Sequence, residues 1–444
     1  MAQSIKTIYS HAAGIDIGSV SVFVAVEDQQ VKSFGTFTSE YKLLINHLRL
    51  HQITTVAMEA TGVYWYCLYE MLEAAGFEVY LVNGAHVKNV PGRKSDVQDA
   101  QWLQQLHSYG LLRKSYIPED TIRQLRAYTR LRDNHIELAS SHVQHMQKAL
   151  TSMNIRLHEV ISQINGVSGM RVIKAILGGE RNPEQLVQLC DKQIIKKKRD
   201  RVVLSLDGYF KSEHLFALGQ AVQGYEFYQQ QQADCDAQIE ALLQQINEQL
   251  PPPDCPTIGQ PKAARHNHPA IKDLHKLLLT ANGGKDIASI SGFSDKTFLK
   301  LTAEIGTNVD PWPTSDHFTS WLGLTPQIAQ TGKTKRTKKS RSRTRAGQIF
   351  RECALAVADS KYLAIGSFYR RIRSKRGPKI AIKATARKLA VQYYNLLKYG
   401  IQFVEKGIQK YEQQQRQKLE RFISKKAQEL GYQLIDIKTA EVVH

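Results

Sequence analysis

The sequence predicts a mixed α/β part at the N-terminus and a longer, almost entirely helical part behind it. From residue 12 to about 118, short β-rich runs alternate with helical ones. From about 119 to 250, apolar residues recur at threes, fours and sevens, as in amphipathic helices. The rest is helical again but much more basic. We therefore expect three domains: residues 1–118, 119–256 and 270–444.

The α/β part begins with strands. "AGIDIG" leads into "VSVFVAVE", whose four valines alternate with other residues, the period of a half-buried strand. "VKSFGTF" offers a third strand, and the spacing predicts an antiparallel three-strand meander. "TTVAMEATG" is typical of a buried strand that ends in a glycine turn. "VYWYCLYEMLEAAG" then predicts a helix closed by Gly76, and "FEVYLVN" a last strand, so the sheet is mixed.

The middle of the chain predicts two long helices that can pair as an antiparallel coiled coil. An internal bundle and a dimerisation arm explain this pattern equally well. "PPPDCP" breaks the second helix, and "GQPKAARHNHP" is typical of a linker. The apolar positions that define the two helices are Leu125, Tyr128, Leu131, Leu138, Val143, Met146, Leu150 and Met153, then Ile239, Leu242, Leu243 and Ile246.

The amino-acid composition indicates which kind of partner the protein binds. Lys and Arg outnumber Asp and Glu by 60 to 41 over 444 residues, a formal net charge of +19, which favours nucleic acid over a membrane surface. The five cysteines form no C-x-x-C pair, which argues against a disulfide framework and a structural zinc site. No stretch is apolar enough for export or membrane spanning. We expect a soluble cytoplasmic protein.

One segment is extremely basic. In "KTKRTKKSRSRTR", residues 333–345, eight of thirteen residues are Lys or Arg and the others are Ser or Thr. Without an apolar residue it is no core helix, so it is either a disordered loop or a segment that contacts phosphates, and the net charge favours the second. The predicted contacts are Lys333, Lys335, Arg336, Lys338, Lys339, Arg341, Arg343 and Arg345.

Four acidic residues occupy telling positions in the α/β part. Asp16 lies in the first strand, Glu59 ends the fourth, and Asp96 and Asp99 open a helix, three residues apart and so on one face. If they converge at one edge of the sheet, their oxygens suit Mg²⁺ or Mn²⁺. Two such ions about 3.5–4 Å apart assist phosphoryl transfer.

Plainer explanations exist for each acid. A "D-x-x-D" at a helix start is usually a cap with a dipole-compatible acid, Asp16 alone suits a turn, and Glu59 alone suits a strand end. The combination of "GIDIG", "MEATG" and "SDVQD" in that order favours a metal site. Ser95 is then expected to cap the helix, while Arg93 and Lys94 face phosphate.

The sequence resembles the DEDD transposases of bacterial insertion sequences (family one-ten with its eleven-eleven group), relatives of the Piv invertase. The resemblance rests on "GIDIGS", "MEATGVYW", "VYLVNGAHVKNVPGRKSDVQDAQWLQQLHSYGLL", "ASISGFSDKTFLKLTAEIG", "FTSWLGLTP" and "GPKIAIKATARKLAVQYYNLLKYG". It implies a RuvC-like, RNase H-type N-terminal domain, a coiled-coil region and a C-terminal transposase domain. The family's acidic tetrad falls on Asp16, Glu59, Asp96 and Asp99.

The resemblance also implies a C-terminal serine nucleophile that bonds to DNA, a structured bridge RNA as guide, and a dimer or tetramer. By register after "GLTP", the serine position holds Thr331, whose hydroxyl carries an extra methyl group. Ser340 and Ser342 are alternatives that require a register shift. "SISGFSDKTFLKLTAEIG" resembles the family's helix–hairpin–helix-like piece, which presents backbone N–H groups to phosphate.

Three function classes compete on these residues. The first is a DNA recombinase that uses the metal-bound acids together with the hydroxyl nucleophile. The second is a metal-dependent, RuvC-like, structure-selective nuclease in which water attacks. The third is an actin-like or sugar-kinase-type ATPase, for which "GIDIGS" mimics a phosphate loop but only "ANGGKD" approaches a second glycine motif.

Overall fold

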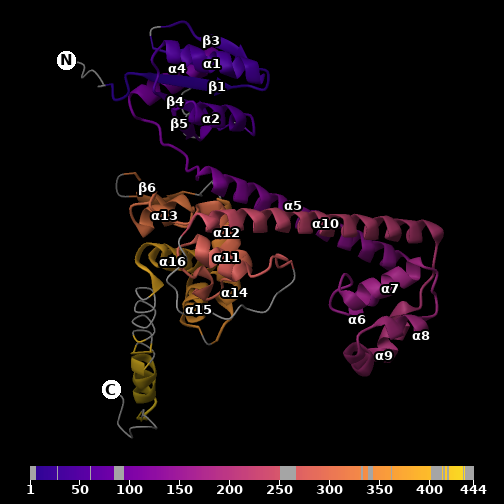
Figure 1. Cartoon of the computed structure of the whole chain (residues 1–444). Helices are drawn as coiled ribbons and strands as arrows, with labels where there is room; N and C mark the ends of the chain where they lie inside the picture. Colours follow the sequence, from indigo (N-terminus) through magenta and orange to yellow (C-terminus); the bar gives the residue numbers. More distant parts are fainter. Residues whose placement is uncertain are drawn as a thin grey trace. The chain divides into compact units, whose positions relative to one another are not determined.

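The computed structural model divides into two compact units, Met1–Ile117 and Pro118–His444 (Figure 1). For residues 327–331 and 334–338 only the backbone is described. Across the whole chain the described ranges are residues 7–27, 29–60, 62–84, 95–250, 267–331, 334–338, 344–361 and 363–401, with short stretches between 413 and 435.

The first unit contains a five-strand sheet in the order β3-β2-β1-β4-β5. β1 pairs antiparallel with β2 and β2 with β3, whereas β1 and β4, and β4 and β5, are parallel. The predicted meander and the mixed sheet are confirmed. The strands are β1 (Ala12–Ile17), β2 (Ser21–Val26), β3 (Lys32–Gly35), β4 (Thr55–Glu59) and β5 (Glu78–Val82).

Helices cover both faces of this sheet. The predicted helix after the fourth strand is α2 (Trp65–Ala74), and Gly76 follows it with a left-handed φ of +90°. α1 (Thr38–Leu50) was not predicted from the sequence, although its buried residues Tyr41, Leu44, Ile45 and Leu48 have helical spacing. α1 and α2 bury one sheet face in a common core, whereas α4 (Asp96–Ser108) packs against β1 and β2.

In the second unit, α5 (Asp120–Ser152) and α10 (Ser212–Glu248) are the two predicted long helices. They run antiparallel, because Arg132 pairs with Asp236 while Gly224 lies against the ring of His142. Figure 1 shows them side by side. Leu131 and Leu138, expected in the apolar stripe, are 46% and 43% exposed.

A small helical lobe connects these two helices. This lobe was not predicted from the sequence. It consists of α6 (Leu157–Val160), α7 (Val167–Leu177), α8 (Pro183–Leu186), the 3₁₀ turn η1 (Val187–Leu189) and α9 (Lys192–Leu206). Its core includes Ile155, Leu157, Val172, Ile173 and Val202, closed by residues from the adjoining ends of α5 and α10. The lobe therefore has a hydrophobic centre of its own.

The C-terminal part is mostly helical, as predicted, but it also contains an antiparallel hairpin, β6 with β7. The expectation of helix alone is wrong there: threonine and isoleucine in "QIAQT" and "TKRTK" favour strands, and charge hid that preference. Its elements are α11 (Leu274–Ala281), η2 (Ile287–Ser289), α12 (Asp295–Ile305), α13 (Ser315–Trp321), β6 (Gln327–Thr331), β7 (Thr334–Lys338), α14 (Arg345–Ala358), α15 (Ala364–Arg376) and α16 (Pro378–Tyr399).

Ion pairs hold the base of α5 to this C-terminal part. Arg130 forms a bidentate pair with Glu304 at 2.7 Å for both bonds, and Arg126 donates to the main-chain oxygens of Ala303 and Glu304 at the end of α12. Lys300 pairs with Asp133 at 2.7 Å.

In the described ranges no helix combines the length and the apolar character needed to cross a membrane.

Candidate active site

Strand geometry places two of the four acids on the same face of the sheet. Side chains alternate along a strand, and Ala13, Ile15 and Ile17 belong to the core under α1 and α2. Gly14 and Asp16 therefore belong to the opposite face, which α4 covers.

The same alternation holds in β4. Val56 and Met58 belong to that core, so Thr55 and Glu59 share the α4 face. The Thr55 hydroxyl confirms this with a 2.9 Å hydrogen bond to Nε2 of His107 on α4. Ile15 is paired with Met58, and one further step of this register sets Asp16 opposite Glu59.

A glycine lets α4 approach β1 closely. A Cβ on Gly14 would lie 2.3 Å from both the main-chain oxygen of Ala100 and the main-chain nitrogen of Gln104, so any larger residue would push the helix away. Gln104 also donates to the oxygen of Ala12. The helix runs antiparallel to β1, and its N-terminus lies at the strand end that carries Asp16.

α4 begins as the sequence predicts. Ser95 is its N-cap, and its hydroxyl accepts a hydrogen bond from the Gln98 N–H at 3.4 Å. Asp96 and Asp99 lie in the first turn, where carboxylates also suit the helix dipole. Because Ser95 already caps the helix, Asp96 and Asp99 are not needed for capping.

The charges of the other three acids act on Asp16. The pKa of Asp16 is raised to about 6, first by burial and then by the negative charges of Asp96, Asp99 and Glu59. Such repulsion is what a bound cation relieves, and the donor set is all oxygen, so these residues fit a hard divalent ion. Within the ranges the structure describes, no group of three or more His, Cys, Asp or Glu side chains is arranged so that it could already hold a metal.

Gly84, just after β5, was not predicted from the sequence, and it lies beside Glu59. A Cβ there would lie 2.1 Å from Oε1 of Glu59, so the bare backbone makes room for this carboxylate. The glycine in "VNG" after a buried strand was its signal. Arg93 and Lys94, predicted to face phosphate, lie outside the described residues.

The predicted nucleophile belongs to the other unit. Thr331 is the last residue of β6, paired with Thr334 of β7, and its backbone alone is described. Ser340 and Ser342 lie outside the described residues, as do Lys333, Lys339, Arg341 and Arg343. Lys335, Arg336 and Lys338 belong to β7, which makes this part of the basic run a strand rather than a loop, and Arg345 begins α14.

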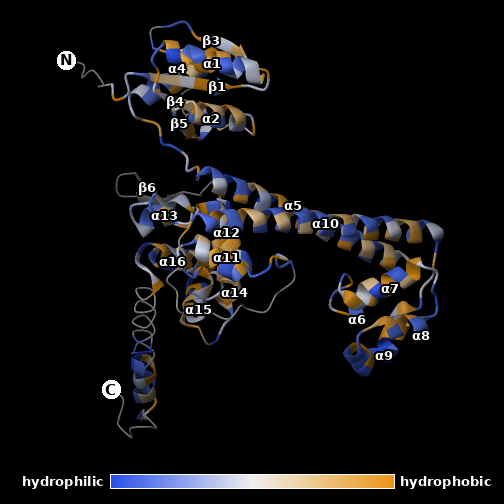
Figure 2. Ribbon diagram, in the orientation of Figure 1, coloured by the Kyte–Doolittle hydropathy of each residue, from blue (hydrophilic) through white to orange (hydrophobic). Residues whose placement is uncertain are grey.

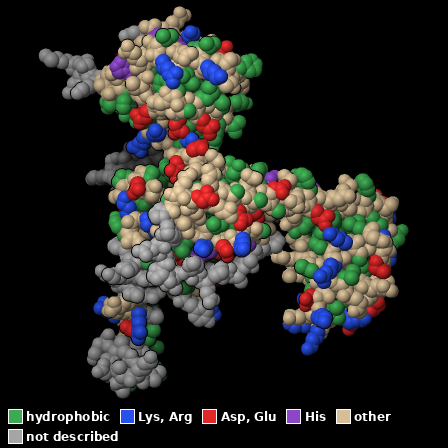
Figure 3. Space-filling model, viewed as in Figure 1, with side chains coloured by type: hydrophobic (Ala, Val, Ile, Leu, Met, Phe, Trp, Pro, Cys, Tyr) green, Lys and Arg blue, Asp and Glu red, His purple; other side chains and the backbone are tan. Residues whose placement is uncertain are grey.

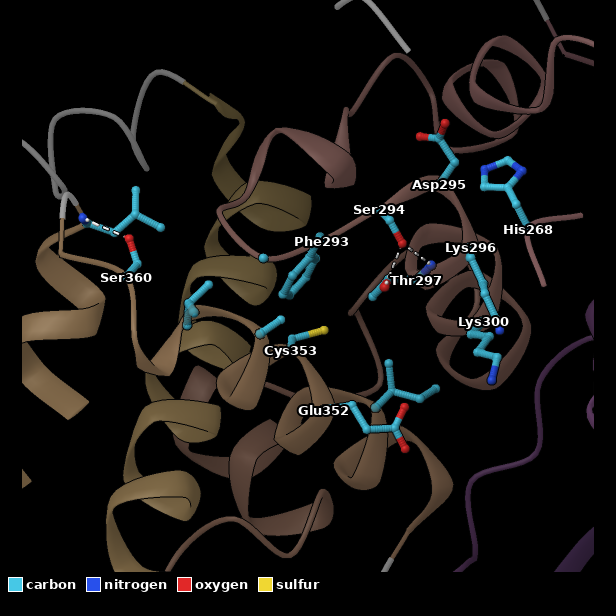
Figure 4. A pocket seen from close by; sticks show the side chains of 15 residues that line it. His268, Phe293, Ser294, Asp295, Lys296, Thr297, Lys300, Glu352, Cys353 and Ser360 are labelled. Carbon is cyan, nitrogen blue, oxygen red and sulfur yellow. Dashed lines mark hydrogen bonds between the residues drawn. The ribbon is translucent and has the colours of Figure 1, made fainter. Parts of the chain in front are cut away.

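The segment "SISGFSDKTFLKLTAEIG" contributes residues that line a cavity of about 580 Å³ between α12 and α14 (Figure 4). Gly292 has a left-handed φ of +88°, and Ser294 caps α12 through the Thr297 N–H. Lys296 lines the same cavity, and burial lowers its pKa. A cation beside a helix N-terminus is an arrangement that suits an anionic group.

The alternative glycine motif belongs to the second unit, whereas the four acids belong to the first. Gly283 and Gly284 of "ANGGKD" close α11, with φ of +61° and +78°. This is a helix end, which removes the support for the ATPase alternative. The cysteines described are Cys67, Cys190, Cys235 and Cys353, all free.

Two family models match the sequence. A DEDD transposase model of the IS110 group matches residues 13–155, and the model for the transposase IS116/IS110/IS902 family matches residues 284–370. The first match covers all four acids, and the second covers Thr331 and the basic run. No curated protein matches the sequence.

Proposed function

Because the chain belongs to the IS110 family of transposases, we propose that it cuts and rejoins element-end and target DNA by metal-dependent phosphoryl transfer at Asp16, Glu59, Asp96 and Asp99. The family itself implies a DNA substrate, cleavage and rejoining, and a divalent metal in general terms. The observation that supports the proposal is geometric: Asp16 and Glu59 belong to the sheet face that α4 covers, and Asp96 and Asp99 lie in the first turn of that helix.

In this proposal the N-terminal sheet is RuvC-like, and Mg²⁺, or Mn²⁺, is the ion that the acids hold. The bound ion supplies charge neutralisation at the phosphate and activation of the attacking oxygen. Asp16 and Glu59 hold their carboxylates on rigid strands, which fixes their separation. Asp96 and Asp99 add the α4 side of the site, and Gly14 keeps that helix close enough to do so.

The hydroxyl of Thr331 is the proposed nucleophile, with Ser340 and Ser342 as alternatives. Attack by its oxygen on the scissile phosphorus forms a phosphothreonine ester and releases the 3′ or 5′ hydroxyl of the cleaved strand, which takes up the proton. A structured guide RNA and a dimer or tetramer complete the proposal. They are supported by the resemblance of the motifs, and the basic run at 333–345 supplies charge for either nucleic acid.

The test is a recombination assay with purified protein, element-end DNA, target DNA, the flanking non-coding RNA and Mg²⁺. Asp96→Asn and Asp99→Asn should each abolish joined product, because an amide is a much weaker ligand for a hard cation. Glu70→Gln, which removes one exposed carboxylate from α2, is the control for loss of charge alone. Joined product that persists in both aspartate variants would refute the metal site.

The RuvC-like nuclease is the second candidate, favoured by the position of all four acids within one compact unit. It predicts strand scission with free ends and no joined product. Replacing the basic run by neutral residues tests the run itself, because loss of DNA binding with a flatter salt dependence is expected only if these cations contact phosphates.

A further inference from the structure

The lobe between α5 and α10, residues 153–211, lies almost entirely outside both family matches. The first match ends at residue 155 and the second begins at 284, so α6 to α9 lie outside both. Yet the lobe has its own hydrophobic core and is no unstructured insertion. A folded element of this size outside the matched regions needs its own explanation.

The lobe is strongly basic. Residues 153–211 contain eleven Lys or Arg against six Asp or Glu. Figure 2 shows α9 as a hydrophilic segment, and Figure 3 shows Lys and Arg side chains on this lobe. Six of the eleven cations fall between Lys192 and Arg201, all within α9.

Two of those six cations interact with other residues of the lobe. Arg199 pairs with Glu184 on α8, and Lys198 donates to the main-chain oxygen of Val160 at 3.1 Å. Lys198 lies at a bend of α9, where its φ of −144° departs from helix. The Lys198 amine is therefore used within the lobe, although the residue is exposed like its neighbours.

The remaining four are Lys192, Lys196, Lys197 and Arg201, which we name the α9 cations. All four are exposed, and among the described residues no acidic side chain forms an ion pair with them. By contrast, Lys174 and Arg156 elsewhere in the lobe are paired with Glu226 and Glu159. Unpaired cations this close together repel one another, and a polyanion relieves that repulsion.

We propose that the α9 cations bind the phosphate backbone of duplex DNA, as a contact separate from the carboxylate site. DNA is the occupant chosen because it is the substrate class that the transposase family implies; to that extent the inference rests on the proposed function. From Lys192 to Arg201 a helix rises about 13 Å. One DNA strand presents about four phosphates over that rise. The contact is independent of sequence, because lysine and arginine on phosphates carry no base information.

The experiment measures the affinity of the full chain for a fluorescein-labelled DNA duplex of arbitrary sequence, in EDTA so that no cleavage occurs, as a function of salt. The test variant carries Lys192→Gln, Lys196→Gln, Lys197→Gln and Arg201→Gln. The control carries Arg156→Gln, Lys174→Gln, Arg416→Gln and Lys426→Gln, four exposed cations that are each paired with an acid. Both variants lose the same net charge.

The α9 variant should bind roughly 10-fold or more weakly, and its slope of log affinity against log salt should flatten by about 3 to 4, while the control keeps the wild-type slope. Equal slopes in the two variants would overturn the inference. Loss of binding to a structured RNA with unchanged binding to the duplex would overturn the choice of DNA. A wild-type chain that binds no duplex at all would contradict the proposed function as well, which distinguishes the two failures.

Discussion

Asp16 is the residue on which the electrostatics of the carboxylate site centres. It is half-buried at the end of β1, and three further carboxylates repel its charge. Repulsion between like charges in this site destabilises the folded protein, and a bound cation removes that repulsion. The position of Asp16 in a strand was predictable from "GIDIG", but its nearness to Asp96 was not, because it depends on how α4 crosses the sheet.

Asp16→Asn is expected to stabilise the metal-free protein at neutral pH by about 1–2 kcal/mol, since it removes one repelled charge. Chemical denaturation in EDTA measures this. Added Mg²⁺ should raise the stability of the wild type and leave the variant unchanged. Glu70→Gln, an exposed acid on α2, is the control and should change little. A variant less stable than wild type in EDTA would contradict the repulsion.

His107 gives the first unit its dependence on acid. It is fully buried on α4, and burial lowers its pKa to about 4, below the ordinary 6.5. The unfolded chain therefore takes up a proton before the folded one does. The stabilisation that comes from burying neutral His107 is fully present above pH 6.5, and it is lost as the pH falls toward 4.

His107→Gln should flatten the loss of stability between pH 7 and pH 5, which for this one histidine amounts to about 2 kcal/mol. Denaturant titrations of both proteins at the two pH values provide the comparison. An equal loss in wild type and variant would show that other groups govern the acid dependence.

At the scale of elements, the packing of α4 on β1 positions the site. The sequence predicted the helix and its Ser95 cap from local signals, and both follow from residues next to each other. It did not predict which sheet face the helix covers, because that depends on Gly14 and on contacts far apart in the chain. The hairpin β6–β7 was missed for a different reason, since charge masked the strand preference of threonine.

Gly14→Ala should destabilise the first unit by about 2 kcal/mol and abolish recombination, because its Cβ would meet the α4 backbone at 2.3 Å. Gly219→Ala is the matched control in α10, where a Cβ meets only the end of Leu177 at 3.7 Å. That change should be neutral or slightly stabilising. Denaturant midpoints and joined product measure both. Full activity of Gly14→Ala would show that α4 need not lie against β1.

A buried ion pair joins α5 and α10. Arg132 and Asp236 are both almost fully buried, and Asp236 also accepts the Ala270 N–H at 2.9 Å. Arg132→Ala leaves that carboxylate buried without its partner and should cost about 3–5 kcal/mol. Arg199→Ala breaks an exposed pair and should cost less than about 1 kcal/mol. Similar losses in the two variants, measured by denaturation, would argue against the buried pair as the anchor.

Across the whole molecule, the order of the main parts was predictable from the sequence, but the small helical lobe was not. The α/β part and the two long helices follow from periodicity, which is a local property. The lobe of α6 to α9 was not predicted because short helices have weak periodic signals, and its core also includes residues from the distant helices α5 and α10. The same limit applies to the proposed partnership of Thr331 with the four acids, which lie in different compact units.

The most direct test of the account is a search for a covalent protein–DNA species, with the adduct mapped by mass spectrometry. Purified protein is incubated with its element-end DNA, its flanking non-coding RNA and Mg²⁺. We expect an adduct on Thr331 that persists in Thr331→Ser and disappears in Thr331→Ala and in Asp99→Asn. An adduct that persists unchanged in Thr331→Ala, or strand scission without any adduct, would contradict the account.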